Sequence, residues 1–107
     1  MSRIDTVFEQ LRSEGRKALM PFVTAGDPDL EFTGDAISTL VSHGASLLEI
    51  GFPYSDPIAD GPVIQASYTR ALGTGLRLPQ IFAAARRWSD QLTTPMAAMV
   101  SYSIVYR

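Results

Sequence analysis

Three short apolar runs, separated by stretches with helical spacing, most constrain what this chain can fold into. The runs cover residues 18–25, 45–50 and 96–102. Between them, apolar residues recur three and four positions apart, as in helices that bury one face. Alternating strands and helices favour a parallel sheet with helices packed outside it. We therefore expect the order helix, strand, helix, strand, short helix, helix, strand.

The expected helices have ordinary start and stop residues. Asp27 suits an N-cap and Pro28 the first helical position, while His43 precedes a glycine and is expected to meet the last carbonyls of its helix. The spacing places Phe32 or Thr33, Val63 and Phe82 on buried faces. The predicted helices cover residues 4–12, 28–42, 62–71 and 79–92.

The second strand carries a carboxylate where a buried strand is normally plain Leu, Ile and Val. Strand alternation puts Leu47 and Glu49 on one face and Leu48 and Ile50 on the other. An ionised Glu in such a run loses solvation. It must be paired with a cation, be neutral for part of the time, or lie at the solvated end of the strand. Glu49 is thus a candidate acid or base, and a structural ion pair is the alternative.

A loop rich in Gly and Pro follows this strand and carries two more carboxylates. Asp60 lies behind a segment that can fold back over the strand end, which makes it a second candidate. Its alternative role is to cap the helix that opens at Pro62. Asp56 and Pro57 can equally form an ordinary turn.

The pattern favours a closed barrel over an open doubly wound sheet. Residues 24–27 do not form the glycine-rich phosphate fingerprint of nucleotide-binding sheets. A (β/α)8 TIM barrel places catalytic side chains at the carboxyl ends of its strands, where Glu49 and Asp60 are expected. Such a barrel needs about 250 residues. We therefore expect residues 1–107 to form the amino-terminal part of a single barrel domain, about its first three strands.

Composition excludes several classes of function. The net charge is −2 and the basic residues are scattered, which argues against nucleic-acid or anionic-lipid binding. The chain has no Cys and one His, so neither disulfides nor a metal cluster is expected. Neither a signal peptide nor a membrane-length apolar run appears, and we expect a cytoplasmic protein.

Two stretches are specific enough to indicate a family. Residues 21–28 (PFVTAGDP) and 48–65 (LEIGFPYSDPIADGPVIQ) resemble the signature segments of the tryptophan synthase alpha chain. The resemblance implies a TIM barrel lyase of tryptophan biosynthesis, which cleaves indole-3-glycerol phosphate to indole and glyceraldehyde 3-phosphate. A retro-aldol cleavage of this kind needs an acid and a base, and one carboxyl group can take both roles.

The resemblance also assigns roles to single residues. It implies that Glu49 is the acid/base and that Asp60 accepts a hydrogen bond from the indole N–H, which becomes more positive in the transition state. Phe22 and Tyr102 would line the indole pocket. Asp56 and Pro57 fall in a loop that would also contact the beta chain.

The family assembles as an alpha2beta2 heterotetramer, in which the beta chain carries pyridoxal phosphate, so the resemblance implies no cofactor and no metal in this chain. The sequence departs from the family at residues 99–104, which keep a Tyr but lack the usual Asn-Pro, and Ser101 competes with Tyr102 for the tyrosine position. Two alternatives remain open. One is a non-catalytic alpha-like module that docks on and modulates a synthase partner, and the other is a related barrel enzyme with another substrate.

Overall fold

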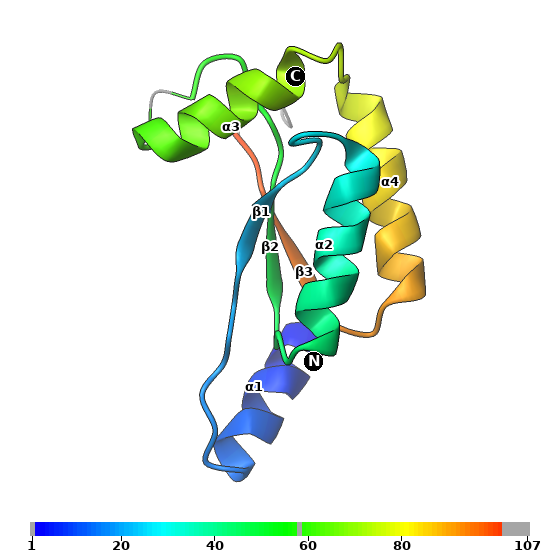
Figure 1. Ribbon diagram of the computed structural model, residues 1–107. Coiled ribbons are helices and arrows are strands. Elements are labelled where there is room, and N and C mark those ends of the chain that lie inside the picture. Colours follow the sequence, from blue (N-terminus) through cyan, green and yellow to red (C-terminus); the bar gives the residue numbers. More distant parts are fainter. Residues whose placement is uncertain (1, 58, 102–107) are drawn as a thin grey trace.

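The computed structural model describes residues 2–57 and 59–101 and contains a parallel sheet with helices along one face (Figure 1). The three strands in the described residues run in the order β1-β2-β3, so each pairs with the next along the chain. The expected order of elements is confirmed, although each strand is shorter than its apolar run. The elements are α1 (Arg3–Ser13), β1 (Phe22–Thr24), α2 (Leu30–Ser42), β2 (Leu48–Gly51), α3 (Pro62–Leu72), α4 (Leu78–Gln91) and β3 (Met96–Met99).

The strand register gives the sheet two different faces. Phe22 pairs with Glu49, and Glu49 pairs in turn with Ala97. Residues in one register row point to the same side of a parallel sheet, and the next residue along each strand points to the other. Leu48 and Ile50 are 0% and 2% exposed, so their side chains point to the face that the helices cover. Glu49 lies on the opposite face, as predicted.

The hydrophobic core lies between the sheet and two helices. Figure 1 shows α2 and α4 side by side along the sheet. Gly34 allows their close approach, because a Cβ atom there would lie 2.9 Å from Nε1 of Trp88. The buried cluster consists of Ala25, Ile37, Ala45, Leu48, Ile50, Phe52, Ile81, Ala84 and Trp88. This packing fixes the strands and therefore the residues at their carboxyl ends.

The start of α2 differs from the prediction. The helix begins at Leu30 with Asp29 as N-cap, and the Asp29 carboxylate accepts a hydrogen bond from the Phe32 amide at 2.7 Å. Asp27 does not cap the helix because its carboxylate binds Arg70 of α3 instead. At the other end His43 is the C-cap residue, with Nδ1 lying 2.8 Å from the Thr39 carbonyl oxygen, as predicted.

Some predicted core positions are wrong. Of the two alternatives at the start of α2, Thr33 is the buried residue, with 1% of its surface exposed. Phe32 is 55% exposed. Val63 in the first turn of α3 is 79% exposed. Phe82 is half exposed and contacts the Phe52 ring edge-on, with centroids 5.1 Å apart. Within the described part of the chain, every helix is too short or too polar to cross a membrane.

Candidate functional site

Glu49 lies in the middle of β2, half-buried, on the sheet face opposite the helical core. Its amide donates a hydrogen bond to the Pro21 carbonyl at 3.0 Å, and Phe22 is its register partner on β1. The ion pairs of residues 2–57 and 59–101 join Arg16 to Glu14 and Arg70 to Asp27. Among these residues no Lys or Arg forms an ion pair with Glu49, so they do not support the alternative of a structural ion pair. A carboxyl beside an aromatic ring can exchange protons with an aromatic ligand that rests on the ring.

Gly51, two residues further on the same face, is where two side chains converge. A Cβ atom at Gly51 would lie 2.8 Å from Cε2 of Phe22, even closer to Cζ, and 2.9 Å from the Tyr68 hydroxyl. Only a glycine leaves room for both groups. The carboxyl end of β2 is thus shaped by Phe22 from β1 and by Tyr68 from α3.

Gly51→Ala should lower the free energy of unfolding by about 1–3 kcal/mol, because the added methyl group overpacks this contact. Chemical unfolding of the two forms measures the difference. Gly61→Ala is the matched control, since nothing lies within 4 Å of a Cβ at Gly61. Its φ of −74° suits any residue, and although Gly61 is the N-cap of α3, the loss of stability should stay below that of Gly51→Ala. Equal stability of both variants would contradict the overpacking argument.

A cavity of about 310 Å³ opens beyond the carboxyl end of β2. It contains three of the predicted site residues, Asp56, Pro57 and Asp60, but neither Phe22 nor Glu49 lines it. Tyr68 connects the two regions, because it lines the cavity and also approaches Gly51. The lining residues are Phe52, Tyr54, Asp56, Pro57, Ala59, Asp60, Tyr68, Met99, Val100 and Ser101. Tyr102 lies outside the described residues, while its competitor Ser101 lines the cavity.

Tyr68 is a site residue that the sequence analysis missed. Its side chain is 3% exposed. Burial raises the pKa of its hydroxyl, and the negative charge of Asp60 raises that pKa further. The hydroxyl is therefore protonated at neutral pH and available as a hydrogen-bond donor to a ligand in the cavity. Its helical spacing from Ile64 and Ala71 is the signal that could have found it.

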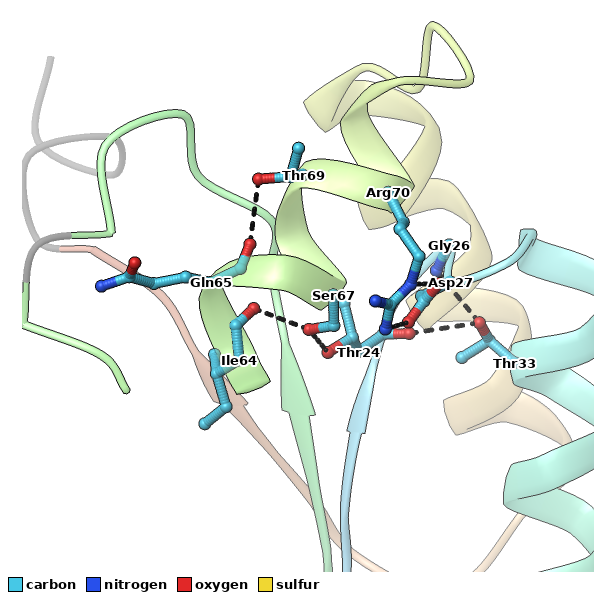
Figure 2. A network of polar contacts seen from close by, with 9 residues as sticks. All are labelled: Thr24, Gly26, Asp27, Thr33, Ile64, Gln65, Ser67, Thr69 and Arg70. Carbon is cyan, nitrogen blue, oxygen red and sulfur yellow. Dashed lines mark hydrogen bonds and ion pairs between the residues drawn. The ribbon is translucent and has the colours of Figure 1, made fainter. Parts of the chain in front are cut away.

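Polar contacts hold α3 across the ends of the strands (Figure 2). The hydroxyl groups of Thr24 and Ser67 share a buried hydrogen bond of 2.7 Å. Arg70 donates to both carboxylate oxygens of Asp27, at 3.1 and 2.9 Å. The helix that follows the Asp60 loop is thus attached to β1 and to the segment after it.

The loop before α3 contains a turn that is closed by a backbone hydrogen bond. The Asp60 amide donates to the Pro57 carbonyl at 3.2 Å, which supports the turn predicted around Asp56 and Pro57. The N-cap of α3 is Gly61, so Asp60 does not occupy the capping position that was its alternative role. In the described ranges there is no group of three or more His, Asp or Glu that could hold a metal ion.

Comparison with known proteins gives one consistent family. The family model described as tryptophan synthase alpha chain matches residues 8–107. The tryptophan synthase alpha chain of Rhodopirellula baltica is 49% identical over 110 residues, which cover 100% of this chain and 40% of that relative. The chain therefore spans about 40% of the length of such curated relatives.

Solved structures agree with this match. Tryptophan synthase subunit alpha from Legionella pneumophila superposes with a TM-score of 0.93 at 37% identity, covering 99% of this chain and 41% of that one. The tryptophan synthase a2b2 complex of Pyrococcus furiosus matches with a TM-score of 0.78 at 40% identity, over 84% of this chain and 36% of that one. These neighbours are TIM barrels, so the predicted fold class is confirmed: the strands and helices described here correspond to the amino-terminal part of a (β/α)8 barrel.

Proposed function

Since the chain belongs to the tryptophan synthase alpha chain family, we propose that its protein is the lyase that cleaves indole-3-glycerol phosphate to indole and glyceraldehyde 3-phosphate. The observation that carries the proposal is the half-buried carboxyl of Glu49, in register with Phe22 and next to the cavity that holds Asp60. An acid/base group beside an aromatic surface and a second carboxylate is what the cleavage of an indole substrate requires.

The bond that breaks joins C3 of the indole to the hydroxyl-bearing carbon of the glycerol chain. C3 takes up a proton, the hydroxyl loses one, and the electron pair of the broken bond returns to the indole ring while the hydroxyl oxygen becomes the aldehyde oxygen. Glu49 can supply the first proton and accept the second, because one carboxyl group can act as acid and then as base. Phe22 would pack against the face of the indole ring beside Glu49.

Asp60 would act on the opposite side of the reacting ring. Protonation at C3 leaves positive charge on the indole nitrogen, and a carboxylate that accepts the N–H hydrogen bond stabilises that charge. The position of Asp60 in the cavity wall, near the protonated hydroxyl of Tyr68, supports this role.

We further propose that the loop with Asp56 and Pro57 contacts a tryptophan synthase beta chain in an alpha2beta2 assembly. Asp56 is exposed and Pro57 half-buried, and both line the cavity, so a partner can reach the surface of this loop. The pyridoxal phosphate of the overall reaction would belong to that partner. A cytoplasmic location stays a prediction from the sequence.

The test is the reaction itself, with the complete product of the gene, alone and with its beta chain. Indole-3-glycerol phosphate should give indole and glyceraldehyde 3-phosphate in equal amounts, as measured by chromatography and by a coupled dehydrogenase assay. Binding of the beta chain without any indole would instead favour the docking module. Turnover only of other aldose phosphates would favour the related barrel enzyme.

A further inference from the structure

We propose that Gln65 is a positioning residue for Asp60, a role that rests on the proposed lyase function. Its side-chain Nε2 donates hydrogen bonds to two loop carbonyls, that of Asp60 at 2.6 Å and that of Pro57 at 3.1 Å. The same two residues are joined by the turn hydrogen bond between the Asp60 amide and the Pro57 carbonyl. One amide group thus clamps both ends of the turn that carries the second carboxylate.

The chemistry of the clamp requires a donor. Both partners are carbonyl oxygens, so only the NH2 group of the Gln65 amide can face them, and a carboxylate at this position would have nothing to donate. Gln65 is half-buried in the first turn of α3. Its backbone N–H donates a hydrogen bond to the Gly61 carbonyl at 3.0 Å. Figure 2 shows its side chain pointing away from the Thr24–Ser67 contact, toward the loop that precedes the helix.

The helix that carries Gln65 is itself attached to the sheet. The Thr24–Ser67 and Asp27–Arg70 contacts tie α3 to β1 and to the segment after it. The side-chain amide of Gln65 therefore extends this frame onto the loop that carries Asp60. Through that frame, β1 sets the position of Asp60 relative to Glu49.

Gln65→Glu in the complete protein should reduce kcat for indole formation about 10- to 100-fold, since a small misplacement of a catalytic group has effects of this size. The matched control is Gln80→Glu in the first turn of α4. Gln80 uses its oxygen, accepting from the Arg77 amide at 2.8 Å, and a Glu keeps that acceptor. The control should therefore retain wild-type turnover. Gln65→Met, which removes the donor without adding charge, replaces Gln65→Glu if the charged variant does not fold.

A double-mutant cycle separates positioning from a general defect of α3. In an Asp60→Asn background, Gln65→Glu should lower kcat by less than about 2-fold, because residues that act through one group are not additive. A loss as large as in the wild-type background would overturn the proposal.

Cleavage by chymotrypsin after Tyr54, inside the same loop, gives a readout that does not depend on the reaction. Gln65→Glu should raise the cleavage rate at Tyr54 several-fold, while its melting temperature matches that of Gln80→Glu. Unchanged cleavage would overturn the positioning role, even in a protein that makes indole. Absence of indole in the wild-type protein, together with faster cleavage in the variant, would instead count against the proposed lyase alone.

Discussion

Glu49→Gln is expected to abolish indole formation while the protein keeps its fold. Glutamine has nearly the same shape, so it can occupy the half-buried position beside Phe22, but it can neither give nor accept the protons of the cleavage. General acid–base catalysis contributes about 10²- to 10⁴-fold, and here one group serves both proton transfers, so kcat should fall by at least about 10³-fold. Single-turnover release of indole measures the loss.

The control for this variant is Glu9→Gln, the same chemical change on the exposed face of α1. It should leave turnover unchanged, and both variants should melt at the wild-type temperature. Normal indole release from Glu49→Gln would remove the acid/base assignment. Beta-chain binding by both variants, without indole even from the wild type, would favour the docking module.

The order and type of the elements could be predicted because their signals are local. Helical spacing predicted α2 over residues 28–42 and α4 over residues 79–92, within about two residues of the observed Leu30–Ser42 and Leu78–Gln91. The face of β2 also follows from alternation alone, which put Leu48 and Ile50 in the core and Glu49 opposite.

Other features depend on contacts between distant segments, and no local pattern contains them. Asp27 and Asp29 are both good N-cap residues, and the choice between them is decided by Arg70, which lies 43 residues away from Asp27. Phe32 and Thr33 both fit the helical stripe, but the hydroxyl of Thr33 accepts a hydrogen bond from the Gly26 amide at 3.0 Å and is buried there.

The candidate site also contains residues that the sequence indicates and residues that only the fold reveals. Glu49 stands out in the sequence because a carboxylate is unusual in a buried strand. Asp60 stands out because its loop can fold back over the end of that strand. The contributions of Tyr68 and Gln65 do not, since a Tyr and a Gln in a helix have many ordinary roles. Only the crossing of α3 over the strand ends brings them to Gly51 and to the Asp60 loop.

Asp60→Asn is expected to reduce kcat for indole formation about 10²- to 10³-fold, the usual effect of removing one group aimed at charge that develops in the transition state. Asparagine keeps the size of the side chain and can still accept a hydrogen bond, so the loss isolates the negative charge. Asp90→Asn on the exposed face of α4 is the matched control and should keep wild-type turnover.

The same variant tests whether Asp60 faces the cavity, independently of turnover. The charge of Asp60 adds to burial in raising the pKa of Tyr68, so Asp60→Asn should lower that pKa while burial still holds it above the ordinary value. Tyrosinate absorbance during an alkaline titration, taken as the difference from Tyr68→Phe in each background, isolates this one tyrosine. A lower pKa with normal turnover would leave Asp60 in the cavity wall without a role in the cleavage. An unchanged pKa with lost turnover would mean that Asp60 acts from a position that does not face Tyr68.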